Sequence, residues 1–411
     1  MSKVEASKAP FLPYGRQLIE EDDVAAVAEV LRGDWLTTGP AVAAFEKALC
    51  EVTGAAHAVA CANGTAALHL AALALRLSPG DRVIVPSITF LATANAVRLV
   101  GGEVVFADCD PDSGLMEAPQ LDAAIRQAGT EGGPLKAVFP VHMAGQCAAL
   151  ADIAEVASRH GLAVVDDAAH AIGSRYLTPQ GGARPIGDGR LTAMTTFSFH
   201  PVKTIAMGEG GAVTTNDAAL AQDLRHLRSH GMLRDAERMQ NADLAFDATG
   251  ELNPWYYEMP EIGLNYRITD IQCALGLSQI KKLDRFVARR RALVRRYDER
   301  LAELAPLLRP IAKSEASEAA WHLYAVLIDF EAAGVSRAVV MERLRARGIG
   351  TQVHYIPVHL QPYYRERYGA QRLPGAERYY ARTLSLPLFA SMQDADVDRV
   401  VEALRLALGH A

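Results

Sequence analysis

Short apolar, β-branched runs alternate with amphipathic or alanine-rich stretches along the first half of the chain. The apolar runs predict strands at 57–61, 82–85, 103–107, 136–141 and 162–166. The stretches between them predict helices at 65–77, 90–100, 120–127 and 148–160. Continuous apolar strands separated by helices are typical of a parallel sheet that is covered on both faces. With right-handed crossovers, this pattern predicts a doubly wound α/β layer.

The alternation changes after about residue 190. Residues 191–199 and 211–215 predict two adjacent strands around a glycine-rich turn, and 231 to about 259 predicts a loop with few periodic apolar positions. From Thr269 the pattern is strongly helical. The arginine-rich stretch 285–300 predicts a long exposed helix that leaves the first domain.

The remainder of the chain predicts a smaller α+β unit. Its expected elements are a strand from about residue 322, a helix at 336–347, a strand at 350–354 and a helix at 394–408. We therefore expect a large, mostly parallel-sheet α/β domain over 11–280 and a small C-terminal α+β domain over 281–411. The segment 11–40 is expected to pack across the other elements.

Charge and cysteine content exclude several classes of function. The 411 residues hold 42 Lys and Arg against 48 Asp and Glu, a net charge of −6, which argues against a nucleic-acid binder and a polybasic membrane protein. The five cysteines form no C-x-x-C pair, so we expect no metal site and a cytoplasmic location. The longest apolar run, 65–77, is interrupted by His69 and Arg76 and is too short to span a bilayer of about 30 Å.

The first candidate site is Asn63-Gly64-Thr65, between a predicted strand and a predicted helix. A tight turn that feeds a helix N-terminus presents free N–H groups and a positive dipole end, which suit a phosphate. The alternative is a plain N-cap formed by Asn or Thr. Neither a G-x-G-x-x-G nor a G-x-x-x-x-G-K-[ST] motif follows a predicted strand, which counts against a dinucleotide site or a P-loop.

The second candidate site is Asp166-Asp167-Ala168-Ala169-His170, at the end of a predicted buried strand. Open α/β sheets bind ligands at this edge, and a carboxylate there is costly unless it is paired. It could bind a metal, act as a base or pair with a cationic ring nitrogen. The alternative is that an Asp caps the next helix, and His170 alone would more often be structural.

The third candidate site is Ser198-Phe199-His200-Pro201-Val202-Lys203, followed by Gly208-Glu209-Gly210-Gly211. A lysine just past a strand end, beside small residues, is typical of a Schiff-base lysine, which must be partly desolvated to keep its amine free. The alternative is an ordinary surface lysine.

The three candidate sites together match one cofactor, pyridoxal 5′-phosphate (PLP). Its phosphate needs a helix N-terminus, its pyridine nitrogen a carboxylate, and its aldehyde a lysine. The order in the chain suits the fold, since each site follows a strand.

Several motifs carry a resemblance over nearly the whole chain to the DegT/StrS-type nucleotide-sugar aminotransferases, which have the aspartate aminotransferase fold (PLP-dependent transferase fold type I). They are 33–40 (GDWLTTGP), 62–68 (ANGTAAL), 86–90 (PSITF), 167–170 (DAAH), 198–200 (SFH) with Lys203, 208–211 (GEGG) and 263–267 (GLNYR) leading to Asp270.

The resemblance implies roles that agree with those argued from the residues. Lys203 would form the Schiff base and shuttle the proton, and Asp167 would pair with the pyridine nitrogen; these are the catalytic residues. The other cofactor-binding residues would be Gly64, Thr65, Ala66, Phe90, His170, Ser198 and Asn265, with Phe90 stacked on the ring. Asn265 would reach the phosphate from a second subunit, which implies a homodimer with shared active sites. Many relatives have Gln at the position of His170, near the 3-oxygen of the cofactor.

Within the family, 199–204, 255–258 and 352–364 resemble the UDP-4-amino-4,6-dideoxy-N-acetyl-β-L-altrosamine transaminases of pseudaminic acid biosynthesis. The resemblance implies transfer of the amino group of L-glutamate to C4 of a UDP-4-keto-6-deoxy-N-acetylhexosamine. The expected substrate-binding residues are Tyr14, His200, Arg267, His354, Tyr355 and His359. Both substrates are anionic, so a cationic side chain is expected in the site, with Arg16, Arg228 and Arg267 as candidates.

Four alternatives accompany this interpretation. The first is an aminotransferase of another nucleotide-linked keto sugar. The second is a PLP-dependent sugar dehydratase, although that group is known for histidine where this chain has Lys203. The third is a non-catalytic regulator, which would be expected to lack Lys203 or Asp167, whereas this chain has both. The fourth, a Rossmann dehydrogenase, lacks its glycine motif.

Overall fold

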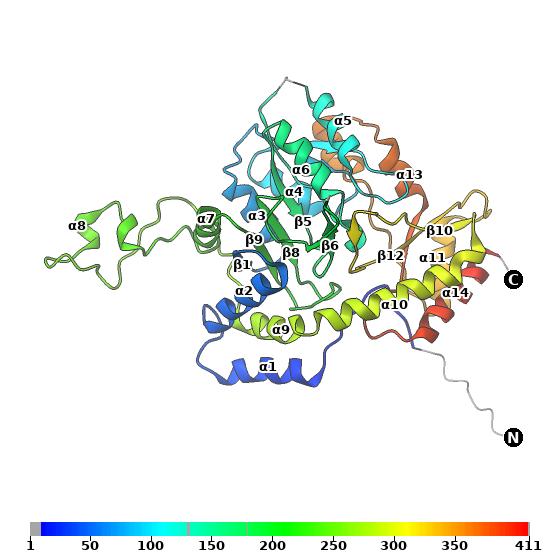
Figure 1. The fold of residues 1–411 in the computed structure, drawn as a ribbon, viewed down its shortest axis with the longest axis horizontal. Coiled ribbons are helices and arrows are strands. Elements are labelled where there is room, and N and C mark those ends of the chain that lie inside the picture. Colours follow the sequence, from blue (N-terminus) through cyan, green and yellow to red (C-terminus); the bar gives the residue numbers. More distant parts are fainter. Residues whose placement is uncertain (1–9, 130–131, 179, 410–411) are drawn as a thin grey trace.

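The computed structural model describes residues 10–129, 132–178 and 180–409. A seven-stranded sheet lies at the centre, with helices packed around it and a long pair of helices along one side (Figure 1). Among these residues, no helix combines the length and the apolar character needed to cross a bilayer.

The central sheet has the strand order β1-β9-β8-β5-β4-β2-β3. Its strands are β1 (His57–Cys61), β2 (Arg82–Pro86), β3 (Glu103–Ala107), β4 (Leu135–Val138), β5 (Ala163–Asp167), β8 (Met194–Ser198) and β9 (Gly211–Thr215). The neighbours from β3 to β8 pair in parallel, whereas β9 is antiparallel to both β1 and β8. The predicted mostly parallel α/β sheet is therefore confirmed, and so is the predicted pair of adjacent strands around the glycine-rich turn.

The described helices include every predicted one, close to its predicted position, and others that the pattern did not predict, among them those at 21–32, 40–53, 218–228, 362–368 and 374–382. The helices before residue 230 are α1 (Glu21–Arg32), α2 (Pro40–Thr53), α3 (Gly64–Ala74), α4 (Leu91–Leu99), α5 (Ala118–Ala128), α6 (Leu150–Arg159) and α7 (Ala218–Arg228). Those after it are α8 (Ala242–Ala245), α9 (Asp270–Ile280), α10 (Leu283–Leu301), α11 (Arg337–Ala346), α12 (Pro362–Tyr368), α13 (Pro374–Arg382) and α14 (Asp394–Leu408). The boundaries of α14 match the prediction, and Thr269 caps α9 through its side chain, which accepts from the N–H of Gln272.

Two small sheets complete the described strands. One has the order β10-β12-β13, with β10 (Leu308–Pro310), β12 (Tyr324–Ile328) and β13 (Thr383–Leu386) all antiparallel. The other joins β11 (Ser317–Glu318), β6 (Arg175–Leu177) and β7 (Ala183–Pro185). The second sheet pairs a strand from the middle of the chain with one from beyond residue 300, a contact that no local pattern predicts.

The predicted strand at 350–354 is wrong. In that segment, Gly350 donates its N–H to Leu12, whereas Gln352 exchanges backbone hydrogen bonds with Ser385. Because the pairing partner changes within two residues, only isolated bridges form and no ladder extends.

The N-terminal segment packs across other elements. Helix α1 packs along α9 (Figure 1). Further upstream, Leu12 bridges to Ile349, and the carbonyl of Tyr14 accepts from the N–H of Leu388. The N-terminal segment thereby contacts parts of the chain that follow the central sheet in the sequence.

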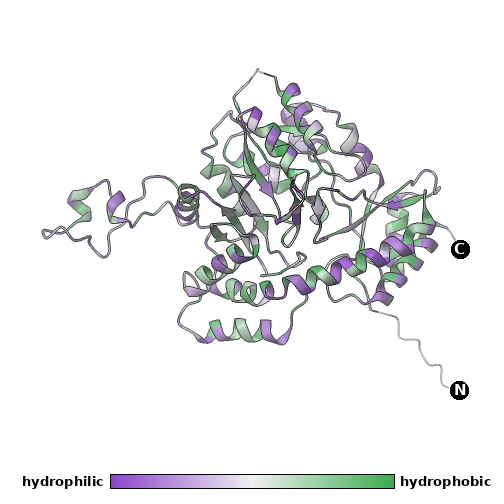
Figure 2. Cartoon of the chain, in the orientation of Figure 1, coloured by the Kyte–Doolittle hydropathy of each residue, from purple (hydrophilic) through white to green (hydrophobic). Residues whose placement is uncertain are grey.

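The arginine-rich helix is present as α10, but its predicted exposure is wrong along one face. The side chains of Phe286, Leu293 and Tyr297 are buried there, and hydrophilic and hydrophobic turns alternate along the helix (Figure 2). Most unexpectedly, Arg290 is only 1% exposed. Alternation of charged and apolar residues therefore marks an amphipathic helix that covers a core.

The buried guanidinium of Arg290 connects three segments. It donates to the carbonyls of Trp321, His322 and Leu388 at 3.0–3.3 Å. Among the described residues, no carboxylate is paired with it. Burial lowers the pKa of Arg290 to about 10, so the group stays charged at neutral pH. Three carbonyl dipoles therefore compensate the charge in place of an acidic side chain.

An arm of the chain extends away from the central sheet between α7 and α9 (Figure 1). Its two sides meet at the antiparallel bridges Leu233↔Glu258 and Phe246↔Leu252. The predicted loop at 231–259 is confirmed, since it contains only the short helix α8 and one 3₁₀ turn, Ala236–Arg238. Large apolar side chains on the arm are exposed, among them Trp255 at 75% and Leu244 at 61%.

The division of the chain at residues 280–281 remains a prediction. One continuous cluster of buried side chains includes Val83 and Val85 of β2 as well as Val326 of β12 and Leu384 of β13. The two regions thus share apolar contacts.

Replacing Arg290 by Met should lower the free energy of unfolding by roughly 2 kcal/mol or more, because three buried carbonyls lose their donor. Urea unfolding curves measure the change. The control is Arg295→Met on the same helix, where the side chain is exposed and the change should stay within about 0.5 kcal/mol. Equal midpoints for the two variants would contradict the role assigned to Arg290.

Candidate functional site

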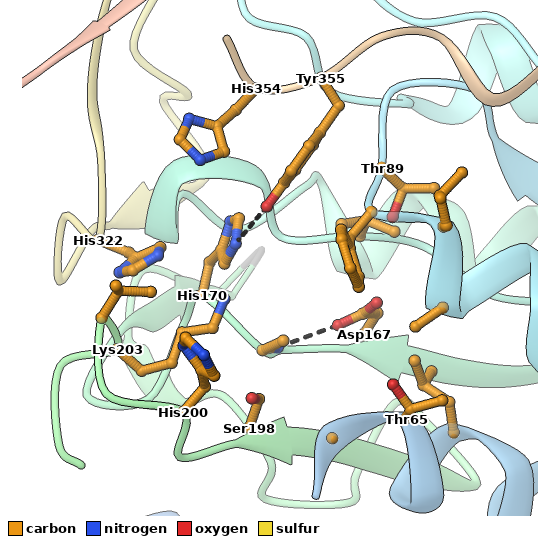
Figure 3. A pocket seen from close by; sticks show the side chains of 18 of the residues that line it. Thr65, Thr89, Asp167, His170, Ser198, His200, Lys203, His322, His354 and Tyr355 are labelled. Atoms are coloured by element: carbon orange, nitrogen blue, oxygen red, sulfur yellow. Dashed lines mark hydrogen bonds between the residues drawn. The ribbon is translucent and has the colours of Figure 1, made fainter. Parts of the chain in front are cut away.

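A cavity of about 610 Å³ lies at the carboxyl ends of the central strands, where open α/β sheets bind ligands. Its size is typical of a small-molecule site. Figure 3 shows the side chains that face it, with Lys203 on one side and Asp167 on the other. The wall is formed by the turn from β1 to α3, the loop from β2 to α4, the ends of β5 and β8, and the segment 352–356.

The turn from β1 to α3 leaves N–H groups free at a helix N-terminus. Asn63 is the N-cap of α3, and its side-chain oxygen accepts from the N–H of Ala66 at 2.8 Å. Within the described residues, the N–H groups of Gly64 and Thr65 have no protein acceptor. Together with the positive end of the helix dipole, these two N–H groups can bind an anion.

Glycine is required in this turn because of Ser198 at the end of β8. A Cβ at Gly64 would lie 2.7 Å from the Cβ of Ser198 and 3.0 Å from its Oγ. On the other side, a Cβ at Gly211 would lie 2.2 Å from the carbonyl oxygen of Asn63. The turn is therefore held between the two adjacent strands, and the hydroxyl of Ser198 lies beside the free N–H groups.

Asp167 ends β5 and is 5% exposed. Its Oδ2 accepts from the hydroxyl of Thr93 at 2.6 Å, and its Oδ1 accepts from the N–H of Ala169 at 3.1 Å. Each oxygen of the Asp167 carboxylate thus accepts one hydrogen bond from the protein, and Asp167 also lines the cavity.

Lys203 lies in the turn that follows β8, with its N–H donating to the carbonyl of His200 at 2.8 Å. Burial lowers the pKa of Lys203 to about 8, and the attraction of Asp167 opposes the shift only in part. A sizeable fraction of this amine is therefore unprotonated near neutral pH, which a nucleophilic lysine requires.

Three histidines, His170, His322 and His354, lie on the same side of the cavity as Lys203 (Figure 3). The ring of His170 lies 4.4 Å from that of His322, and its Nε2 is 3.1 Å from the hydroxyl of Tyr355. His354 contacts the hydroxyl of Ser385 through Nδ1 at 2.8 Å. Burial first, and then repulsion by Lys203, lowers the pKa of His354 to about 3.

Burial is also the largest cause that holds the pKa values of His170 and His322 well below the ordinary range. Repulsion by neighbouring basic groups adds to it, from Lys203 for His170 and from His170 and Lys203 for His322. All three rings are therefore neutral at physiological pH. Neutral imidazoles can hydrogen-bond to hydroxyl and carbonyl groups without adding charge to the cavity.

Most of the predicted site residues meet in this cavity. Those that line it are Tyr14, Gly64, Thr65, Phe90, Asp167, His170, Ser198, His200, Lys203, His354 and Tyr355. They come from segments as far apart in sequence as Tyr14 and Tyr355, so the tertiary fold alone assembles them.

Four predicted residues lie outside the cavity wall. Ala66 is buried in α3 and its N–H is taken by Asn63. His359 is buried behind the wall, with Nδ1 2.6 Å from the hydroxyl of Ser87. Asn265 is exposed, and Arg267 lines a separate hollow of about 230 Å³.

The cationic candidates named from the sequence also lie elsewhere. Arg16 is exposed, whereas Arg228 pairs with Glu46 at 2.7 Å. Among the described residues, Lys203 is the single Lys or Arg in the cavity wall.

Sequence reasoning missed His322, Thr89 and Glu209, which also line the cavity. Thr89 belongs to the PSITF motif, which offered a local signal. His322 offered none, because it reaches the site through the contact of its backbone N–H with the carbonyl of Ala144.

The described residues fit PLP. The space in front of Gly64, which a Cβ would fill, lies beside two free N–H groups and the hydroxyl of Ser198 and suits a phosphate. The carboxylate of Asp167, which the hydroxyl of Thr93 already orients, suits the protonated pyridine nitrogen of PLP. The largely desolvated amine of Lys203 suits its aldehyde.

Comparison with known families supports this interpretation. Residues 17–405 match the model of the DegT/DnrJ/EryC1/StrS aminotransferase family. The spore coat polysaccharide biosynthesis protein SpsC of Bacillus subtilis is 40% identical over 398 residues, which cover 96% of each chain.

Two solved structures are similar over nearly the whole chain. Helicobacter pylori PseC, an aminotransferase involved in the biosynthesis of pseudoaminic acid, has a TM-score of 0.85 at 29% identity, covering 98% of this chain and 100% of that one. A putative sugar aminotransferase from Streptococcus pneumoniae, in its PLP form, has a TM-score of 0.83 at 27% identity, covering 97% and 99%. The fold is thus that of the PLP-dependent aminotransferases, as predicted.

Lys203 in the cofactor-free protein should react with trinitrobenzenesulfonate with a pH midpoint near 8. Only the unprotonated amine reacts; at pH 7.5 about a quarter of Lys203 is in this form, against roughly 0.1% of an ordinary lysine. Mass spectrometry of the labelled peptides measures the rate, with the exposed Lys47 as internal reference. A Lys203 rate that keeps rising to pH 10, in parallel with Lys47, would contradict the desolvated state.

Proposed function

Because the chain belongs to the DegT/DnrJ/EryC1/StrS aminotransferase family, we propose that it is a PLP-dependent aminotransferase that acts on a nucleotide-linked keto sugar. The observation that carries the proposal is one cavity that holds a free helix N-terminus, an oriented carboxylate and a desolvated lysine. We also propose that it works in the cytoplasm.

Different residues of the chain would hold different parts of PLP. Gly64, Thr65 and Ser198 would hold the phosphate of PLP, and Asp167 the proton-bearing ring nitrogen. When bound, PLP supplies an electron sink for the carbanion that forms when a proton leaves the amino donor. Phe90, which is 55% exposed and lines the cavity, would cover the ring.

Lys203 would be the proton carrier in both halves of the reaction. Its Nζ would take up the proton released from the α-carbon of the amino donor and deliver a proton to the sugar carbon that receives the amino group. A group with a pKa of about 8 can both accept and donate near neutral pH.

For substrates, we propose L-glutamate and a UDP-4-keto-6-deoxy-N-acetylhexosamine aminated at C4. PseC is involved in pseudoaminic acid biosynthesis and SpsC in spore coat polysaccharide biosynthesis, and both similarities support a sugar substrate. The neutral rings of His354 and His170 and the hydroxyls of Tyr14 and Tyr355 supply hydrogen-bonding groups that suit sugar hydroxyls.

We further propose a homodimer whose subunits share their active sites. Asn265 lies outside the cavity of its own chain, so a role in binding the phosphate requires a second copy. Both substrates are anionic, yet Lys203 is the single Lys or Arg in the described cavity wall. A partner would supply the missing positive charge.

The purified protein should bind PLP, and its absorbance should change when L-glutamate is added, with release of 2-oxoglutarate. Lys203→Ala should abolish this turnover, since removal of a proton carrier typically costs about 10²–10⁴-fold. Lys281→Ala, on the exposed side of the turn between α9 and α10, is the matched control and should behave as the wild type. A wild-type protein that does not bind PLP would refute the proposed function.

A panel of UDP-, dTDP- and GDP-linked 4-keto sugars and a 3-keto sugar identifies the acceptor. We expect the highest kcat/KM with the UDP-linked N-acetylated 4-keto sugar. A preference of tenfold or more for another sugar would keep the aminotransferase and overturn the proposed acceptor, because such a ratio corresponds to about 1.4 kcal/mol in the pocket.

Mixed dimers test the shared site. Lys203→Ala and Asn265→Ala should each be nearly inactive alone. After unfolding and refolding together, half of the dimers would be hybrids with one intact site, so activity should return to about a quarter of the wild type. No recovery, with hybrid dimers verified by tagged subunits, would show that Asn265 does not act across the interface.

A further inference from the structure

Thr93 is a buried residue that no prediction placed in the site. It lies on α4, is 0% exposed and does not line the cavity. Its hydroxyl nevertheless donates to Oδ2 of Asp167 at 2.6 Å, and it is 2.8 Å from the hydroxyl of Thr89, which does line the cavity. The three side chains form a continuous chain of hydrogen bonds, in which the buried Thr93 connects two residues of the cavity wall.

The direction of these bonds follows from the number of protons. An ionised carboxylate only accepts, so the proton of Thr93 is committed to Asp167. Thr89 must then donate to Thr93, because each hydroxyl carries one proton. The carbonyl of Phe90 is a poor alternative acceptor for Thr93, since it lies 3.4 Å away.

The carboxylate of Asp167 needs these donors to keep one orientation. The terminal torsion of an aspartate is broad and has no sharp rotamer minima. One donor on each oxygen, Thr93 on Oδ2 and the N–H of Ala169 on Oδ1, therefore fixes the rotation of the group. The bond from Thr93 is the shorter of the two, and hydrogen bonds to charged groups are roughly twice as strong as neutral ones.

We propose that Thr93 is the positioning residue of Asp167: its hydroxyl holds the carboxylate in the orientation in which it meets the ring nitrogen of PLP. The proposal rests on the proposed function. Thr93 does not line the cavity and would act through Asp167. Thr89 is one hydrogen bond further from Asp167 than Thr93 is. Because the hydroxyl proton of Thr89 points to Thr93, its oxygen presents lone pairs to the cavity.

Three substitutions separate the hydroxyl of Thr93 from its shape. Thr93→Val keeps the branched side chain and removes the donor. Thr93→Ser keeps the donor and removes a methyl group. Thr53→Val is the matched control: Thr53 is also buried, and its hydroxyl donates within α2 to the carbonyl of Leu49 at 2.8 Å.

The dissociation constant of PLP, measured by quenching of the fluorescence of the cofactor-free protein, is the first readout. We expect Thr93→Val to weaken PLP binding by about 10- to 100-fold, the range for one lost hydrogen bond to a charged group. Thr93→Ser should stay within about threefold of the wild type, and Thr53→Val should match it. Thr89→Val should have a smaller effect than Thr93→Val.

The glutamate half-reaction is the second readout. Thr93→Val should lower kcat while the KM for glutamate stays nearly unchanged, because Thr93 has no contact with the cavity. Thermal unfolding of the cofactor-free variants checks folding, and we expect Thr93→Val and Thr53→Val to lose similar stability.

Two results would overturn the role of Thr93. One is wild-type PLP affinity and kcat in Thr93→Val. The other is an equal loss in Thr93→Ser and Thr93→Val, which would assign the effect to packing. In both cases the wild-type protein still binds PLP and transaminates, so the proposed function stands. If the wild type binds no PLP, the proposed function and the role of Thr93 fall together.

Discussion

The close approach of the turn from β1 to α3 to the adjacent strands is the constraint on which the site depends. Gly64 lies against Ser198, and Gly211 lies against the carbonyl of Asn63, at distances that leave no room for a side chain. This contact brings the N-terminus of α3, with its unpaired N–H groups, beside the end of β8, where the turn that holds Lys203 begins. The antiparallel insertion of β9 between β1 and β8 makes it possible, because β9 begins where β1 and β8 end.

Desolvation then sets the chemical state of the cavity. The same burial that lowers the pKa of Lys203 to about 8 keeps the surrounding imidazoles neutral. Asp167 is the countercharge, and its carboxylate is held from behind by Thr93 and Ala169. The result is a cavity with one amine that can exchange a proton near neutral pH, among groups that form hydrogen bonds without competing for that proton.

The far side of the cavity depends on α10. Arg290 binds the carbonyl of His322, whose ring lies on His170, and it binds the carbonyl of Leu388, whose N–H holds Tyr14. One buried cation thus connects two cavity residues that lie some three hundred positions apart in the chain. In the homodimer that we propose, the exposed Asn265 would act at the site of the second copy of the chain.

Apolar periodicity and turn residues act locally, so the amino-acid pattern alone was enough to predict the α/β class, the strands of the central sheet and the three motifs at their ends. It also placed Lys203, Asp167 and Gly64 correctly at strand ends. The burial of Arg290 and the absence of a strand at 350–354 became visible only in the folded chain. So did the places of His322 in the cavity wall, of Thr93 beside Asp167 and of His359 behind the wall. Each of these outcomes depends on partners distant in sequence, whose packing and hydrogen bonds no local pattern records.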